Sequence, residues 1–255
     1  MITPKGREKV RSRISDACRR LILSQQMVDL CEQQATPKQE EFLAFVLEEE
    51  IHRREQNRRA RQLSRAGFPA LKSLEGYEYS AIRFPTSLSR EELLSCQFVG
   101  EKKNLILFGP VGIGKTHLAI ALGAKACAMG MNVRFYTVTE LVLKLGEAHR
   151  SGRLERLIRD LVQLDLLILD EWGYVPIDKE GSQLLFRVVA DSYESKSLIL
   201  TTNLEFSKWG GIFTDEQMAA AMIDQLVHHG HLLIFEGQSY RMTHALMRQT
   251  ATPTS

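Results

Sequence analysis

A glycine-rich turn that ends in lysine and threonine is the stretch of this sequence best suited to chemistry. The octapeptide GPVGIGKT, residues 109–116, fits the pattern G-x-x-x-x-G-K-[ST]. The apolar run NLILF precedes the turn, and HLAIALGAKACAMG, which has a helical pattern, follows it. A strand, a turn and a helix in this order are the context in which such a turn binds the phosphates of a nucleotide. The alternative is a glycine turn in which the lysine occurs by chance.

The residue types in this turn suit a nucleotide and a divalent cation. Backbone N–H groups from Gly112 to Thr116 would converge on phosphate oxygens at a helix N-terminus. Lys115 would bring a positive charge to the outer phosphates, and the Thr116 hydroxyl is a ligand for Mg²⁺. We predict cofactor contacts from Gly109, Pro110, Val111, Gly112, Ile113, Gly114, Lys115, Thr116 and His117.

Two acids end a second apolar run, LLILDE, at residues 166–171. The period of two in a strand turns Asp170 and Glu171 to opposite sides. Asp170 would hold Mg²⁺ together with Thr116, and Glu171 would orient or deprotonate an attacking water as a general base. A pair of solvated acids at the end of a strand is the simpler alternative.

A third buried run, SLILTTN at residues 197–203, ends in a polar amide. The carboxyl ends of parallel strands share one edge of a sheet, so Asn203 is expected close to the two acids. There it could hold the attacking water. Asparagine is also an ordinary turn residue after a strand, and this prediction therefore depends on the other two motifs.

The elements that position these residues follow from alternating apolar patterns. After Gly100, short apolar runs alternate with longer amphipathic ones, which predicts an α/β fold with a parallel sheet and helices on both faces. The expected strands are residues 104–108, 133–138, 166–170, 197–202 and 232–236.

Residues 15–65 contain no glycine and one proline, and their apolar residues have helical spacing, so we expect a helical segment in which Pro37 begins the second helix. Residues 65–89 gather glycine and proline and predict an irregular connection. The predicted domains are a helical N-terminal domain at 1–66, a connection at 67–99, a nucleotide-binding domain at 100–250 and a flexible tail at 251–255.

A basic stripe is expected near the end of the helical domain. Arginines at spacings of four, three and four form one face of a helix, with Glu55 as the only acid from 53 to 65. This pattern favours binding to a phosphate backbone without sequence preference, although a solvated helix face is the alternative. The candidate DNA contacts are Arg53, Arg54, Arg58, Arg59, Arg61 and Arg65.

The remaining composition predicts a cytoplasmic protein with no membrane partner. Four scattered cysteines lack the spacing of a metal site and are expected to be reduced. The N-terminus lacks an apolar signal core, and no stretch approaches eighteen apolar residues. His228, His229 and His231 lack cysteines or paired acids nearby, so packing or helix capping is expected of them rather than metal binding.

The three motifs in this order resemble the AAA+ ATPases, and longer stretches resemble the IstB family. These helper ATPases are encoded by insertion sequences beside their transposase. The stretches are DEWGYVPID at 170–178, TTNLEFSKWGGIF at 201–213, LVHHGHLLIFEGQSYR at 226–241 and RREQNRRARQLSRAGFPALKSLEGYEY at 53–79. The resemblance covers about residues 40 to 248.

This resemblance implies an ATPase that uses ATP and Mg²⁺, forms homo-oligomers on double-stranded target DNA and stimulates a partner transposase. It also implies that Arg241, in QSYR, reads the γ-phosphate. The DnaC-type helicase loaders are related, and a loader is the alternative function. A metabolic P-loop kinase would need a lid for its acceptor substrate, whereas this chain has a basic arm.

One position departs from the family pattern. Members of the group usually show Asp-Arg where this chain reads MIDQLVHH, and the arginine would reach the nucleotide of a neighbouring subunit. Gln225 occupies that position here. A neutral amide cannot supply the charge that such an arginine gives to the transition state. We therefore expect slow hydrolysis with nucleotide binding intact.

Overall fold

The computed structural model describes residues 4–173, 177–213, 215–237 and 239–240. The chain folds into two compact units, Met1–Arg61 and Gln62–Ser255. Each unit has its own architecture and is described separately below.

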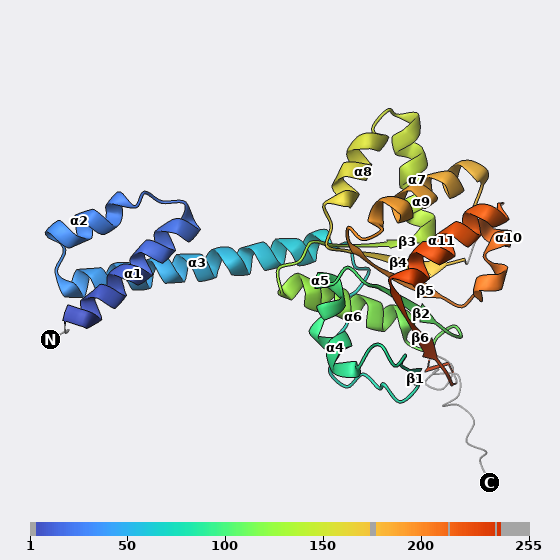
Figure 1. The fold of residues 1–255 in the computed structure, drawn as a ribbon, viewed down its shortest axis with the longest axis horizontal. Helices are drawn as coiled ribbons and strands as arrows, with labels where there is room; N and C mark the ends of the chain where they lie inside the picture. The colour runs from blue at the N-terminus through green and yellow to red at the C-terminus, as the bar shows by residue number, and fades with distance from the viewer. Residues whose placement is uncertain (1–3, 174–176, 214, 238, 241–255) are drawn as a thin grey trace, which may run out of the picture. The chain divides into compact units, whose positions relative to one another are not determined.

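The first unit consists of helices (Figure 1). They are α1 (Pro4–Leu21), α2 (Gln26–Gln34) and α3 (Pro37–Arg65), the last of which ends within the second unit. Proline is favoured in the first turn of a helix, where its missing N–H costs nothing, and Pro37 begins a helix as predicted. That helix is the third rather than the second, because the chain leaves the helical conformation at residues 22–25, between α1 and α2.

Apolar spacing and a buried carboxylate hold these helices together. Ile14 and Cys18 of α1 and Ala44 of α3 are fully buried in one apolar cluster. Glu40 is also fully buried, and its carboxylate accepts hydrogen bonds from Nε of Arg7 at 2.8 Å and Nε of Arg11 at 3.0 Å. The hydrogen bond from Arg7 is the largest cause that holds the pKa of Glu40 below its ordinary value. Paired in this way, a buried carboxylate links α1 to α3.

The second unit contains a six-stranded sheet whose strands lie in the order β1-β6-β2-β5-β4-β3. All neighbouring pairs are parallel except β1 with β6, so the predicted parallel sheet is confirmed. The strands are β1 (Ile82–Arg83), β2 (Asn104–Phe108), β3 (Val133–Thr137), β4 (Leu166–Trp172), β5 (Ser197–Thr202) and β6 (Gly230–Phe235). The stretch expected to be an irregular connection thus contains β1, which is too short to give a strand pattern.

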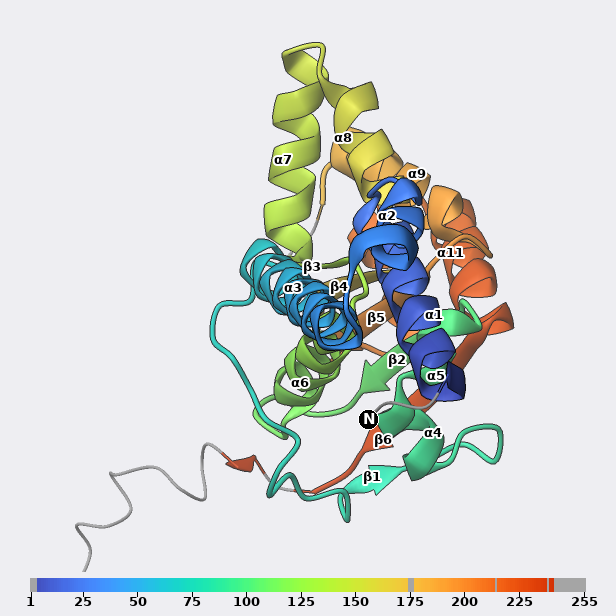
Figure 2. The ribbon, with the colours of Figure 1, turned by 90° about the vertical axis from the view of Figure 1, so that its left-hand side faces the viewer.

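Helices cover both faces of this sheet (Figures 1 and 2). One face packs against α4 (Arg90–Ser95), α5 (Gln97–Gly100) and α6 (Lys115–Ala128). The other face packs against α7 (Val138–Arg150), α8 (Leu154–Val162), α9 (Lys179–Ser192), α10 (Gly210–Phe213) and α11 (Glu216–His228). A short 3₁₀ turn, η1 (Phe206–Lys208), precedes α10.

Strand β4 shows why the apolar runs were readable as strands. Leu166 and Ile168 belong to the apolar core on one face of the sheet, and Leu167 and Leu169 to the core on the other. Successive side chains of a strand alternate between faces, so a strand that is covered on both sides is apolar throughout. All four side chains are fully buried.

Candidate nucleotide site

The predicted phosphate-binding turn connects β2 to α6, as expected. Gly109 and Gly114 show why this turn needs glycine. A Cβ on Gly109 would lie 2.5 Å from the carbonyl oxygen of Phe235, and Gly114 has φ +100°, in the left-handed region. Glycine adopts that region without the clash that a side chain would cause. The turn therefore has the backbone freedom that a phosphate cradle needs.

Lys115 lies inside this turn. Its side chain is 9% exposed, and Nζ donates hydrogen bonds of 2.6 Å to the carbonyl oxygens of both Gly109 and Pro110. The ammonium group is thus surrounded by the backbone that would surround a phosphate. A buried, positively charged group at this position suits an anionic ligand.

Thr116 and Asp170 form a hydroxyl–carboxylate pair. Thr116 Oγ1 donates a hydrogen bond of 2.9 Å to Oδ1 of Asp170, which is 5% exposed at the end of β4. Hard oxygen ligands of this kind are those that Mg²⁺ prefers. The two predicted metal ligands are therefore adjacent, and their chemistry fits the cation.

Glu171 lies beside Asp170 but is exposed to solvent. The alternation of side chains along a strand does not fully explain why one acid is buried and the other exposed, because the pairing of β4 with β5 changes register at this point. Leu169 pairs with Leu200 and Trp172 pairs with Thr202, which leaves Asp170 and Glu171 opposite Thr201 alone. Such an irregularity re-aims a side chain at the end of a strand.

Asn203 directly follows β5 and is exposed. Strand β5 lies between β2 and β4, so the three motifs lie at the carboxyl ends of three adjacent parallel strands. The Gly109 N–H also donates a hydrogen bond of 3.1 Å to the carbonyl oxygen of Thr202. The structure thus brings the predicted loop, acids and amide to one edge of the sheet.

Sequence reasoning missed a contribution from the connection before β1. The Tyr77 hydroxyl donates a hydrogen bond of 3.1 Å to the carbonyl oxygen of Gly114, and burial raises the pKa of this phenol. His117 Nε2 lies 2.8 Å from the carbonyl oxygen of Ser73. No local spacing in this segment signals that it packs on the start of α6.

Two further residues were singled out in the sequence, Arg241 for this site and Gln225 for the site of a neighbouring subunit. Arg241 lies outside the described residues. Gln225 lies on α11, where its Oε1 atom is buried without a hydrogen-bond partner among the residues that the structure describes. A buried amide oxygen of this kind is unusual, because most buried polar atoms are paired.

The six predicted DNA contacts all lie on α3 and are exposed. Arg53 and Arg54 donate to the carboxylate of Glu50 at 2.6 Å and 2.9 Å. In the described parts of the chain, no ion pair involves the other four, Arg58, Arg59, Arg61 and Arg65. These four arginines are therefore the more available to an anionic partner.

A second set of arginines was not anticipated. Exposed arginines recur every three residues along the end of α7 and through α8, in the stretch RSGRLERLIR. They are Arg150, Arg153, Arg156 and Arg159. The regular spacing in HRSGRLERLIR was the available sequence signal.

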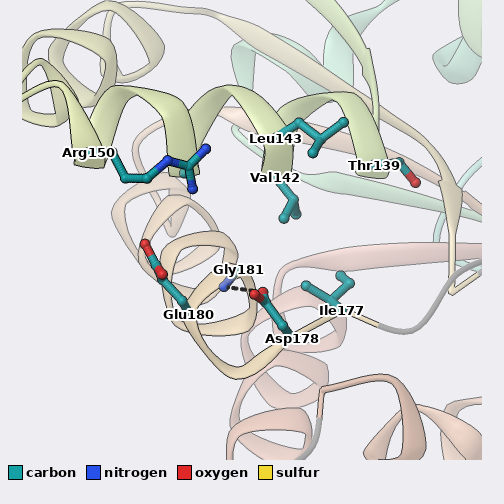
Figure 3. Close-up of a pocket in the computed structure, with 9 residues that line it drawn as sticks. Thr139, Val142, Leu143, Arg150, Ile177, Asp178, Glu180 and Gly181 are labelled. Carbon is teal, nitrogen blue, oxygen red and sulfur yellow. Dashed lines mark hydrogen bonds between the residues drawn. The ribbon is translucent and has the colours of Figure 1, made fainter.

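A cavity of about 250 Å³ lies between α7 and the start of α9 (Figure 3). Val142 and Leu143 reach it from α7, and Ile177 reaches it from the segment before α9. Asp178 accepts a hydrogen bond of 2.8 Å from the N–H of Gly181 and so caps α9. None of the predicted nucleotide-site residues lines this cavity, which is separate from the phosphate-binding turn.

The three histidines make packing contacts. His231 is buried, and its Nδ1 lies 2.9 Å from the Ser87 hydroxyl. The rings of His228 and His229 lie beside Tyr193, at centroid distances of 6.4 Å and 5.1 Å. These contacts connect the end of α11 and the turn after it to the end of α9.

Comparison with known proteins identifies the family. Residues 21–248 match the IstB-like ATP binding proteins. An ATP-binding protein of insertion sequence IS21 from Pseudomonas aeruginosa is 40% identical over 205 residues, which are 79% of this chain and 76% of the relative. An ATP-binding protein of insertion sequence IS5376 from Geobacillus stearothermophilus is 34% identical over 238 residues, which are 91% of this chain and 95% of the relative.

Solved structures show the same fold at lower identity. The DnaC helicase loader superimposes with a TM-score of 0.52 and 22% identity, covering 64% of this chain and 96% of the loader. DnaI superimposes with a TM-score of 0.51 and 17% identity, covering 65% of this chain and 91% of DnaI. No helix in the described parts of the chain is long and apolar enough to cross a membrane. The chain belongs to the family of IstB-like ATP binding proteins and has the AAA+ fold.

Proposed function

We propose that this protein is the ATP-dependent DNA-binding helper of an insertion sequence. It would oligomerise on duplex target DNA, deliver that DNA to the transposase of the same element and stimulate it. The observation that carries this proposal is the match to the IS5376 protein, which extends over 91% of this chain and 95% of the relative. A relationship that includes both units supports a shared role better than a shared nucleotide fold does.

The nucleotide site supplies the chemistry of the proposal. Lys115 and the N–H groups of the loop would bind the phosphates, and Thr116 and Asp170 would hold Mg²⁺. A Mg²⁺ ion held by these two residues would supply positive charge that offsets the negative charge of the phosphates during hydrolysis. Glu171 would take the proton of the attacking water, and Asn203 would orient that water. Arg241 would read the γ-phosphate.

Hydrolysis would be slow because Gln225 brings no charge to a neighbouring subunit's nucleotide. An arginine in trans stabilises the charge of the transferring phosphoryl group, which an amide does far less. Nucleotide binding does not depend on that charge. ATP would therefore act chiefly as a switch for assembly, with hydrolysis to ADP and phosphate resetting it.

The exposed arginines of α3 would bind the DNA backbone. Surface ion pairs contribute little stability, so the Glu50 pairs of Arg53 and Arg54 would open at small cost when a phosphate is near. Contacts of this kind bind all sequences and weaken with salt.

The arginines of α7 and α8 form a second candidate surface for DNA. The protein would meet its DNA and transposase in the cytoplasm.

The test is a reconstitution with duplex DNA, MgATP and the transposase encoded beside this gene. The proposal predicts that this protein raises strand transfer by the transposase only when MgATP is present. A helicase loader would instead bind a replicative helicase and leave strand transfer unchanged. The same transposase assayed with the Lys115→Ala variant controls for nonspecific stimulation by a basic protein.

A further inference from the structure

We propose that Thr201 is a positioning residue that holds both acids of β4 in place for ATP hydrolysis. This inference rests on the proposed ATPase function and concerns a residue that none of the three sequence motifs assigns to the chemistry. It follows from where the hydroxyl of Thr201 lies, between the carboxylate of Asp170 and the backbone of Glu171.

The Thr201 hydroxyl makes one hydrogen bond to each acid. Oγ1 donates to Oδ1 of Asp170 at 2.5 Å and accepts from the backbone N–H of Glu171 at 3.0 Å. Thr201 is 2% exposed, so water does not compete for these bonds. A hydroxyl group can donate one hydrogen bond and accept others, and the Thr201 hydroxyl does both.

The register change between β4 and β5 explains why the hydroxyl is needed. Asp170 and Glu171 together lie opposite Thr201, because Leu169 pairs with Leu200 and Trp172 with Thr202. The extra residue of such a bulge loses its regular ladder partner. The side chain of Thr201 accepts the N–H of Glu171 in place of a backbone carbonyl.

The backbone of Glu171 is also in an unusual conformation. Its φ of +62° lies in the left-handed region, which non-glycine residues rarely adopt. Strained conformations persist when the surrounding structure holds them. The hydrogen bond from its N–H to Thr201 is one such restraint, and it fixes the direction in which the Glu171 side chain leaves the sheet.

On the other acid, Thr201 shares Oδ1 of Asp170 with Thr116. If the Thr116 hydroxyl turns to a metal ion, Thr201 is the donor that continues to hold this carboxylate. Thr201 lies on β5, between β2, which precedes the loop, and β4, which carries the acids. Its hydroxyl therefore reaches Asp170 from the neighbouring strand.

The neighbouring threonine does not share this role. Thr202 Oγ1 donates to the carbonyl oxygen of Trp172 at 2.8 Å and accepts from the N–H of Leu204 at 3.0 Å. Both partners are backbone groups. Of the two threonines in TTN, Thr201 is the one whose hydroxyl reaches a carboxylate.

The test compares four variants with the wild type: Thr201→Val, Thr201→Ser, Thr201→Ala and Ser197→Ala. Thr201→Val keeps the shape and removes the hydroxyl, and Thr201→Ser keeps the hydroxyl. Ser197→Ala is the control, because Ser197 is a buried residue at the other end of β5 whose hydroxyl donates to the carbonyl oxygen of Phe98 at 3.0 Å. It removes a comparable hydrogen bond far from the acids.

Two readouts separate positioning from stability. The first is hydrogen exchange of the Glu171 amide in nucleotide-free protein, which we expect to be faster in Thr201→Val and normal in Thr201→Ser and Ser197→Ala. The second is ATPase kinetics. We expect kcat to fall roughly tenfold or more in Thr201→Val, which is part of the roughly 10²- to 10⁴-fold rate increase that a positioned base contributes. The KM for ATP should stay within about threefold of the wild-type value.

The inference is overturned if Thr201→Val shows wild-type exchange at Glu171 or a wild-type kcat. Equal losses of kcat in Thr201→Val and Ser197→Ala would also overturn it, since both would then reflect a weakened strand. Thr201→Ala lacks the hydroxyl as well and must give the same losses, which covers a poorly folded Val variant. A wild-type protein without ATPase activity would refute the proposed function instead, while the exchange measurement would still test the hold on Glu171.

Discussion

The hydroxyl of Thr116 donates a hydrogen bond of 2.9 Å to Oδ1 of Asp170, across 54 positions of sequence. One residue lies in the first turn of α6 and the other near the end of β4. The contact forms because β2 and β4 are both neighbours of β5 and run parallel to it. The sheet therefore keeps the two proposed Mg²⁺ ligands within one hydrogen bond of each other.

Replacement of Glu171 by Gln should separate binding from hydrolysis. The change removes the proposed base and leaves Lys115, Thr116 and Asp170 to hold MgATP, so turnover should fall by about 10² or more. The DNA-bound complex should persist for as long as in the wild type or longer. The rate of phosphate release tests the loss of turnover, and the lifetime of the DNA-bound complex, measured in the same solution, tests its persistence. Normal turnover would place the base at another residue.

Replacement of Arg54, Arg58, Arg61 and Arg65 by Ala should weaken binding to every duplex sequence. For each phosphate that an arginine no longer neutralises, the slope of log K against log salt should become shallower by about 0.9, and alanine preserves the helix. A titration at several salt concentrations measures the slope. The matched comparison replaces Arg150, Arg153, Arg156 and Arg159 in the same way. An unchanged slope in the α3 variant would mean that its arginines form a solvated face.

Replacement of Gln225 by Arg should accelerate hydrolysis if this position faces the γ-phosphate of a neighbouring subunit. The reason is that positive charge would return to where negative charge develops. The ATPase rate with DNA at saturating nucleotide is the measurement. Gln225→Lys is the control, since its compact charge cannot make the bidentate contacts of a guanidinium. No gain from arginine would show that Gln225 is not at the site in trans.

Replacement of Glu40 by Gln should destabilise the helical unit in a pH-dependent way. The pKa of Glu40 lies below its ordinary value of 4.5 in the folded protein. Its contribution to stability is therefore complete above the unfolded pKa and is lost as pH falls through the folded value. The gap between wild type and variant should be widest above about pH 5 and close in more acidic solution.

Hydrogen exchange of the α1 and α3 amides would measure this gap. Fluorescence of Trp172 and Trp209, the two tryptophans of the chain, would report on the second unit and should not change. Glu48→Gln is the matched control, because Glu48 pairs with Arg13 at the surface and exposed pairs contribute little. Equal effects of the two substitutions would contradict a special role for the buried carboxylate.

The sheet was predictable because its central strands are buried on both faces. Residues 104–108 and 197–202 each contain an uninterrupted apolar run flanked by polar residues or glycine, and β2 and β5 have these limits. Strand β6 begins at Gly230 rather than Leu232, since backbone pairing with β2 extends beyond the apolar run. The ends of a strand depend on backbone pairing with its neighbours, and the local sequence pattern does not predict that pairing.

The candidate site was predictable as a set of motifs but not as a set of contacts. Local spacing identified Lys115, Thr116 and Asp170 because the phosphate loop and the strand acids are short continuous patterns. The hydrogen bond of Tyr77 to the loop spans 37 positions, and the role proposed for Thr201 depends on the register of β4 against β5. Such relationships arise only when the chain folds.

The most direct test of nucleotide-controlled assembly is the mass of the DNA-bound complex as a function of nucleotide. Sedimentation of wild type and Lys115→Ala with duplex DNA would be compared in MgATP, in MgADP and without nucleotide. We predict an assembly of several subunits on DNA for the wild type in MgATP. We predict no such assembly in MgADP or without nucleotide. We also predict none in Lys115→Ala, which lacks the positive charge that would bind the outer phosphates. The same DNA-bound mass in all three conditions, or in the variant, would contradict a nucleotide-controlled assembly.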